Sequence, residues 1–223
     1  MPAVTRPPWR FPDPRVADDE GLVAVGGDLS VPRLLLAYRS GIFPWTVNPV
    51  SWWSPNPRAI FELEHFHTPR SLAKVLRRAP FNVTCNRAFR RVMEACATPG
   101  PGRRGTWITP EFIEAYTGLH QAGHAHSLEC WLSGELVGGI YGVTAGGLFA
   151  GESMFHRVSN ASKVALYHLV ARLRERRFTL FDIQMITPAT RQLGAIEISR
   201  DEYLDRLATA TRLDCRFEDS ATE

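Results

Sequence analysis

Cysteine is scarce in this 223-residue chain, and its spacing excludes several classes of protein. The four cysteines are scattered, with no Cys-x-x-Cys pair among them: Cys85, Cys96, Cys130 and Cys215. This usage is typical of reduced, buried thiols in a cytosolic protein and argues against a disulfide framework or a zinc site. We therefore expect no bound metal ion.

Long apolar runs are also missing. No stretch approaches the roughly 18 to 20 apolar residues that a membrane-spanning helix needs, and the first ten residues lack the apolar core of a secretory signal. With 44% hydrophobic and 22% charged residues, the composition is that of an ordinary globular protein. We expect a cytoplasmic protein that does not associate with membranes.

Acidic residues are absent from one stretch, although the net charge of the whole chain is only +3. Between Thr68 and Met93 there are seven Lys or Arg and no Asp or Glu. Thr68-Pro69 predicts a helix start, and apolar residues then recur on one side with helical spacing. The opposite side is purely basic: Arg70, Lys74, Arg77 and Arg78. A basic helix face is usually only solvated, but the lack of nearby acids favours a polyanion-binding surface.

The remaining segments predict a mixed fold. Helices are predicted over residues 31–39, 86–96, 110–122, 160–177 and 199–213, the last from a Ser199-x-x-Glu202 capping box. Strands are predicted over residues 58–63, 127–132, 136–143, 148–151 and 179–186. Helix, antiparallel meander, helix and strand in this order resemble the N-acetyltransferase (GNAT) fold. We expect an α+β protein with a small N-terminal lobe over residues 1–100 and a GNAT-like, mostly antiparallel domain over residues 101–223.

Two polar residues interrupt the apolar strand near the C-terminus. Asp182 and Gln184 lie two positions apart, so their side chains are expected on the same face of an extended segment. A carboxylate accepts hydrogen bonds and a carboxamide both donates and accepts, so the two can form a coupled polar pair. Burying them among apolar neighbours is costly unless they have partners or a task. The residues alone support a structural pair and a catalytic pair equally well.

Short motifs follow one another in a fixed order along the chain. They are Gly-Gly-Asp-Leu-Ser (26–30), Gly-Ile-Phe-Pro-Trp (41–45), Trp-Trp-Ser-Pro-Asn-Pro-Arg (52–58), Gly-Thr-Trp-Ile-Thr (105–109), Gly-His-Ala-His-Ser (123–127), Gly-Glu-Ser-Met-Phe (151–155) and Gln-Leu-Gly-Ala (192–195). Together with Asp182-x-Gln184, they resemble the bacterial leucyl/phenylalanyl-tRNA–protein transferases from about Gly21 to about Leu213. Each motif alone is weak, whereas the ordered set is specific.

The resemblance implies an activity. Enzymes of this family join Leu or Phe, and also Met, from an aminoacyl-tRNA to the free N-terminal amine of a protein that begins with Arg or Lys. The product carries an N-degron, which marks it for degradation. Because an amine attacks an already activated ester, no cofactor is expected. We expect a monomer whose partners are aminoacyl-tRNA and these acceptor proteins.

The resemblance also implies roles for individual residues. Gln184 orients the attacking amine and Asp182 holds Gln184, while Glu152 lies at the pocket for the aminoacyl side chain. The apolar wall of that pocket is Ile140, Phe149, Leu166 and Phe181. Trp45 and Trp107 stack on the terminal adenosine of the tRNA, and the basic helix face holds the acceptor stem. Ordinary core packing is the competing interpretation for the apolar and aromatic residues.

Two other functions stay open at this point. An acetyl-CoA-dependent N-acetyltransferase would need a glycine-rich pyrophosphate loop before the helix that starts near Asn160, and residues 157–162 contain no glycine. A non-catalytic tRNA-binding protein would explain the basic helix but would leave Asp182, Gln184 and the apolar pocket without a task. The histidines at 120, 124 and 126 are expected to be structural, because Gly123 ends their helix.

Overall fold

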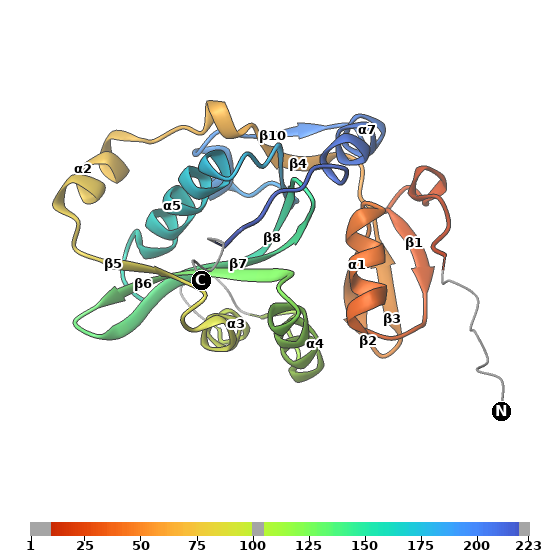
Figure 1. Cartoon of the computed structure of the whole chain (residues 1–223), viewed down its shortest axis with the longest axis horizontal. Helices are drawn as coiled ribbons and strands as arrows, with labels where there is room; N and C mark the ends of the chain where they lie inside the picture. The colour runs from red at the N-terminus through yellow and green to blue at the C-terminus, as the bar shows by residue number, and fades with distance from the viewer. Residues whose placement is uncertain (1–9, 100–104, 219–223) are drawn as a thin grey trace.

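The computed structural model describes residues 10–99 and 105–218, which form two β-sheets with helices packed around them (Figure 1). The smaller sheet has the order β1-β3-β2 and is antiparallel. Its strands are β1 (Leu22–Val25), β2 (Phe43–Val47) and β3 (Val50–Trp53). Helix α1 (Val31–Arg39) joins β1 to β2, packs against β2 and has the bounds predicted for it, residues 31–39.

The larger sheet has seven strands in the order β10-β4-β9-β8-β7-β6-β5. Their bounds are β4 (Arg58–Phe61), β5 (Asn82–Cys85), β6 (Ala125–Leu132), β7 (Glu135–Ala145), β8 (Leu148–His156), β9 (Leu180–Gln184) and β10 (Ala195–Ile198). Among these described strands, all neighbours are antiparallel except β8 and β9, which are parallel. The expected α+β class with a mostly antiparallel sheet is confirmed.

Helices cover both faces of the larger sheet (Figure 1). They are α2 (Arg70–Arg78), α3 (Phe89–Ala97), α4 (Pro110–Gln121), α5 (Ala161–Glu175), α6 (Pro188–Arg191) and α7 (Arg200–Ala210), with short 3₁₀ turns at Pro14–Val16 and Leu63–His65. One hydrophobic cluster contains the apolar residues of α2 and α5, and the other contains those of α1, α3, α4 and α7. The small lobe therefore shares its core with one face of the large sheet.

The two sheets separate between β3 and β4, not near residue 100. Strands β4 and β5 both precede residue 100, yet both belong to the large sheet. The division that we expected between residues 100 and 101 lies outside the described residues and does not separate the sheets. Strand β4 was predicted, whereas β5 was not, because a short strand is specified by its pairing partners more than by its own residues.

Several local predictions differ from the structure for the same reason. Residues 82–85 form β5, so the helix expected from residue 86 begins only at Phe89. The proline-rich aromatic stretch forms β2 and β3, and β10 was not expected at all. Ser199 caps α7, because its hydroxyl accepts a hydrogen bond from the Glu202 N–H at 3.2 Å, while the Glu202 carboxylate accepts from Arg206 at 2.7 Å.

Strands β8 and β9 pair only at their beginnings. Leu148, Phe149 and Ala150 pair with residues 180–182, and beyond this point β8 continues beside β7 while β9 stays beside β4. The two strands therefore separate near three polar residues, Asp182 and Gln184 on β9 and Glu152 on β8. A parallel pair joined by helix α5 thus places polar residues from distant parts of the sequence at one opening in the sheet.

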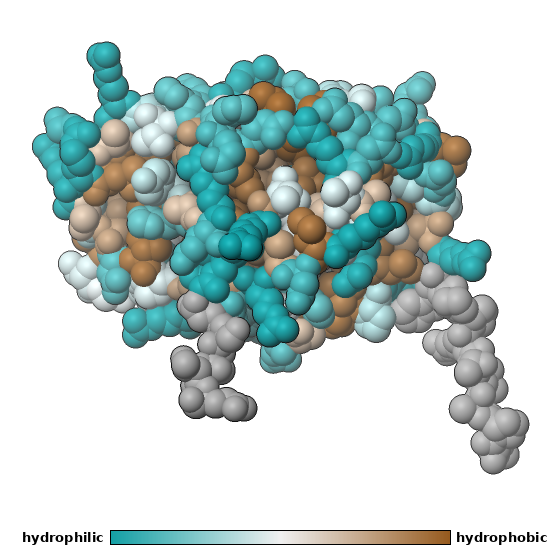
Figure 2. Space-filling view, turned by 45° about the horizontal axis from the view of Figure 1, so that its top comes forward, coloured by the Kyte–Doolittle hydropathy of each residue, from teal (hydrophilic) through white to brown (hydrophobic). Residues whose placement is uncertain are grey.

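The described part of the chain contains no helix that is both long and apolar enough to cross a membrane. Figure 2 shows a face on which hydrophilic side chains predominate and hydrophobic ones occur in small groups. Scattered groups of this kind are normal for a globular protein.

Gly138 lets β7 lie against the start of α5, which gives a test of the fold. A Cβ atom at Gly138 would lie 2.5 Å from the Ala161 Cβ and 2.9 Å from its carbonyl carbon. Gly138→Ala should therefore lower the free energy of unfolding by about 1–3 kcal/mol in urea titrations. Gly118→Ala is the matched control, since its Cβ would meet only Val31 at 3.6 Å inside helix α4. The control should be neutral or stabilising by up to about 1 kcal/mol, and equal losses in both variants would contradict the packing.

Candidate active site

Asp182 is fully buried, and its carboxylate is saturated with hydrogen bonds. Arg58 donates from Nε to Oδ1 at 2.9 Å and from Nη2 to Oδ2 at 2.6 Å. The Tyr203 hydroxyl donates to Oδ2 at 2.9 Å, and the Gln184 backbone N–H donates to Oδ1 at 2.8 Å. A carboxylate has about four acceptor positions, and all four are occupied here. The Asp182 carboxylate is therefore suited to fix the positions of its neighbours.

Arg58 is buried to the same degree and gathers several segments around Asp182. Its guanidinium lies 4.3 Å from the ring centre of Tyr203 on α7 and 4.9 Å from that of Phe43 on β2. Its Nη1 also donates to the Gly41 carbonyl at 3.1 Å. Burial works to lower the pKa of Arg58, but Asp182, Tyr203 and Glu152 together outweigh it and raise the pKa above its ordinary value. The two hydrogen bonds to the two Asp182 oxygens make the pair bidentate.

Gln184 ends β9 in the left-handed backbone region, with φ of 57°. This turn directs its side chain toward β8, where its Nε2 donates to Glu152 Oε1 at 2.8 Å. We had expected the side chains of Asp182 and Gln184 to form a coupled polar pair. In the structure the Gln184 amide group bonds to Glu152 and not to the Asp182 carboxylate. Asp182 fixes the backbone of Gln184, and Glu152 fixes its amide group.

Glu152 is half-buried on β8 and lies at the end of a chain of hydroxyl groups. The Tyr116 hydroxyl is 3.5 Å from Glu152 Oε2, and the Tyr38 hydroxyl is hydrogen-bonded to that of Tyr116. Burial raises the pKa of Glu152 to about 7; the charge of Asp182 adds to this, while hydrogen bonds from Tyr38 and Gln184 oppose it. Burial and the nearby Glu152 carboxylate raise the pKa of both tyrosines, so they stay protonated as donors.

A cavity of about 270 Å³ opens beside Glu152, where β8 and β9 separate. Its wall is mainly apolar and comprises Phe61, Ile140, Gly151, Glu152, Ser153, Met154, Leu166, Ile183, Met185, Thr187 and Thr190. Three of the residues predicted for the aminoacyl pocket, Glu152, Ile140 and Leu166, thus line it. Phe149 and Phe181 are fully buried behind the wall, where Phe181 packs on Phe61 with ring centres 5.4 Å apart.

A second cavity of about 280 Å³ adjoins the first, because Met185 lines both. Its other lining residues are Glu20, Phe43, Trp45, Trp53 and Pro55. Trp45, predicted to stack on adenosine, thus lies beside the cavity at Glu152. Trp107 lines neither cavity and packs edge-on against Phe112, with ring centres 5.0 Å apart.

The predicted basic helix face is present on α2. Its members Arg70, Lys74, Arg77 and Arg78 are all exposed, while Leu72 on the opposite side is buried in the cluster with α5. None of the four lines either cavity. The structure therefore separates this face from the residues around Glu152.

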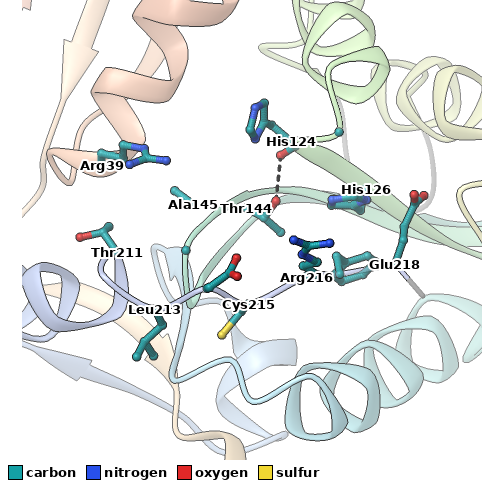
Figure 3. A pocket seen from close by; sticks show the side chains of 14 residues that line it. Arg39, His124, His126, Thr144, Ala145, Thr211, Leu213, Cys215, Arg216 and Glu218 are labelled. Atoms are coloured by element: carbon teal, nitrogen blue, oxygen red, sulfur yellow. Dashed lines mark hydrogen bonds between the residues drawn. The ribbon is translucent and has the colours of Figure 1, made fainter. Parts of the chain in front are cut away.

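A larger, open cavity of about 460 Å³ lies between the C-terminal segment and the β7–β8 turn (Figure 3). Thr144 donates there to the His124 carbonyl at 3.4 Å, and none of the predicted site residues lines this cavity. His126 at its edge stacks on Phe217, and its burial lowers its pKa to about 3. Neutral, stacked histidines of this kind support packing.

Sequence reasoning missed four residues of the site: Arg58, Tyr203, Tyr38 and Tyr116. Arg58 carried a signal, because a buried carboxylate such as Asp182 needs a cation and Arg58 begins a predicted strand. The three tyrosines carried none, since only helix packing brings Tyr38 to Tyr116 and Tyr203 to Asp182.

Comparison with known proteins shows the family of the chain. The sequence profile described as leucyl/phenylalanyl-tRNA protein transferase matches residues 60–208, and the profile of the N-terminal domain of the same name matches residues 27–56. The chain belongs to this family. The two matches meet where the small and large sheets separate.

Individual relatives cover nearly the whole chain. The leucyl/phenylalanyl-tRNA–protein transferase of Nitratidesulfovibrio vulgaris (strain DP4) is 48% identical over 93% of this chain and 90% of its own length. That of Pseudoalteromonas atlantica is 50% identical over 91% of this chain and 88% of its own length. A GCN5-related N-acetyltransferase-like structure from Streptococcus suis 89/1591 has a TM-score of 0.37 at 14% identity, over 71% of this chain and 60% of that one. A likeness of that size carries no inference.

The Arg58–Asp182 pair can be tested through stability. Arg58→Met leaves the Asp182 carboxylate buried without a cation, so the free energy of unfolding should fall by about 3–5 kcal/mol. Urea titration followed by circular dichroism measures it. Arg206→Met is the control, because its pairs with Glu62 and Glu202 are more exposed and should contribute less than about 1 kcal/mol. Similar losses of unfolding free energy in the two variants would show that the buried pair contributes no more to stability than an exposed one.

The pKa of Glu152 predicts a pH-dependent stability. Because folding raises this pKa from 4.5 to about 7, the folded chain holds a proton between these pH values that the unfolded chain has lost. Wild-type stability should therefore fall as pH rises through this window. Glu152→Gln does not titrate, so its stability relative to wild type should increase from pH 4.5 to about 7. A stability difference that stays constant with pH would rule out the raised pKa.

Proposed function

We propose that this protein transfers Leu or Phe, and also Met, from aminoacyl-tRNA to the N-terminal amine of proteins that begin with Arg or Lys. Membership of the family supports the reaction. The observation that carries it is the Glu152–Gln184 pair at an apolar cavity of about 270 Å³. This cavity suits an apolar amino-acid side chain, and the polar pair lies where the ester that follows it would react.

The reaction sets three requirements for the protein. The acceptor amine must lose a proton, attack the ester carbonyl and form an amide bond as the bond to the tRNA ribose oxygen breaks. The side chain of the aminoacyl group must be held, the amine must be oriented, and the proton must be taken up. Orientation alone can contribute several kcal/mol, which is consistent with a site built from rigidly held groups.

Apolar cavity walls explain the range of donors. Ile140, Leu166, Met154 and Ile183 contact the space directly, and Phe149 and Phe181 support the wall from behind. An apolar cavity discriminates between similar side chains by only about 1–3 kcal/mol per methylene. Acceptance of Leu, Phe and Met together follows from such a wall.

The polar groups divide the remaining tasks. Glu152 is the group with a pKa near 7, so at neutral pH it can accept the proton of the attacking ammonium. Gln184 is held by Glu152 and orients the amine. Asp182, whose acceptor positions are occupied, positions Gln184 through its backbone together with Arg58.

The tRNA contacts follow the same geometry. Trp45 lies in the cavity that adjoins the aminoacyl cavity at Met185, which is where the terminal adenosine would follow the ester. Trp45 stacks on this adenosine, and Arg70, Lys74, Arg77 and Arg78 hold the phosphates of the acceptor stem. Trp107 packs on Phe112 outside both cavities, so the structure does not support the adenosine contact that we expected of it. The protein acts as a monomer in the cytoplasm, in the N-degron pathway.

Transfer of radiolabelled Leu and Phe from charged tRNA tests the reaction. We expect transfer to a protein that begins with Arg and none to the same protein beginning with Ala. Glu152→Gln should lower kcat by about 100-fold or more with the Arg-starting acceptor, since general base catalysis contributes about 10²–10⁴. Wild-type protein that binds tRNA but transfers nothing would instead be a non-catalytic tRNA-binding protein.

A further inference from the structure

Two arginines lie against one tryptophan at the β5 edge of the large sheet. The guanidinium carbons of Arg87 and Arg91 are 5.6 Å and 5.3 Å from the ring centre of Trp131 on β6. Both arginines are exposed, and neither makes an ion pair within residues 10–99 and 105–218. Arg90 on the same helix differs, because it pairs with Glu94 at 3.1 Å and Glu114 at 2.6 Å.

Partly buried hydrogen bonds fix the tryptophan ring. Its Nε1 donates to the Thr84 hydroxyl at 2.7 Å, and that hydroxyl donates to Glu129 Oε2 at 2.5 Å. Glu129 is fully buried and also accepts from the Ser127 hydroxyl and from the Ala88 N–H at 3.4 Å. One carboxylate therefore holds both the ring and the start of α3, beside Arg87.

A guanidinium that lies on an aromatic ring keeps N–H donors available for other partners. These donors match the oxygens of a phosphate, which Arg binds in a bidentate manner. The lack of Asp and Glu between Thr68 and Met93 means that this part of the chain supplies no competing carboxylate. The cluster of Arg87, Arg91 and Trp131, called the Trp131 cluster below, thus has the chemistry of a phosphodiester site.

The position of the cluster complements that of the basic face on α2. Helix α2 precedes and α3 follows β5, the edge strand of the large sheet. The apolar side of α2 belongs to one hydrophobic cluster and that of α3 to the other, so the helices lie on opposite faces of the sheet at this edge (Figure 1). Cations that make no ion pair with other described residues therefore flank the edge on both faces.

We propose that the double-stranded part of the tRNA lies across the β5 edge, with its phosphates bound by α2 on one face and by the Trp131 cluster on the other. This inference rests on the proposed function. A duplex presents phosphates along two strands, so it can contact both faces at once. Recognition of this kind follows the shape and charge of the duplex and does not read its sequence.

The test removes the two charges and compares donors with and without a duplex. For Arg87→Gln/Arg91→Gln, the plot of log K for tRNA binding against log salt should lose about two units of slope. The KM for aminoacyl-tRNA should rise about tenfold, while transfer from aminoacyl-adenosine, which has no duplex, should stay within twofold of wild type. Arg90→Gln is the matched control and should keep the wild-type slope, because carboxylates already neutralise Arg90.

Each other outcome has a defined meaning. Equal salt slopes for the double variant and the Arg90→Gln control would overturn the proposed tRNA path. Loss of transfer from aminoacyl-adenosine in the double variant would also overturn it, since the arginines would then act on the active site or the fold. Wild-type protein that transfers from neither donor would overturn the proposed function itself. Trp131→Leu keeps both charges and should still raise the KM for aminoacyl-tRNA, because the ring no longer holds the guanidinium groups.

Discussion

The buried ion pair between Arg58 and Asp182 is the interaction on which the rest of the site depends. Removing two charges from water is expensive, and their attraction offsets this only with good geometry and further hydrogen bonds. Both conditions are met: the pair is bidentate, Tyr203 and the Gln184 N–H complete the carboxylate, and two rings cover the guanidinium. The pair joins β4, β9, α7 and the small lobe at one point.

The reactive groups follow from this anchor. Gln184 occupies the left-handed region, a conformation that costs about 1–3 kcal/mol for a residue other than glycine and persists only when its surroundings enforce it. Asp182 enforces it through the backbone, and the turn directs the amide to Glu152. The separation of β8 from β9 then places an apolar cavity next to that carboxylate. The fold thus places Glu152, whose pKa is about 7, beside a cavity that can hold an apolar side chain.

Local signals in the sequence predicted much of the fold, and long-range contacts account for what they missed. The helix over residues 31–39, the cap at Ser199 and the β6–β8 meander were found because each depends on neighbouring residues. Strands β5 and β10 were missed because these strands are defined by partners far away in the chain. Asp182 and Gln184 were recognised as buried polar residues, but the left-handed turn that separates their side chains could not be read from spacing. Arg58 was missed because its partner lies 124 residues away.

A double-mutant cycle on the transfer rate tests most directly whether the Arg58–Asp182 pair positions Gln184. Single-turnover rates would be measured for Arg58→Met, Asp182→Asn and the double variant, each shown to be folded under the assay conditions. If the two residues act as one unit, the double variant loses no more rate than the slower single variant. If the two losses multiply, the residues act independently, and the pair does not position Gln184.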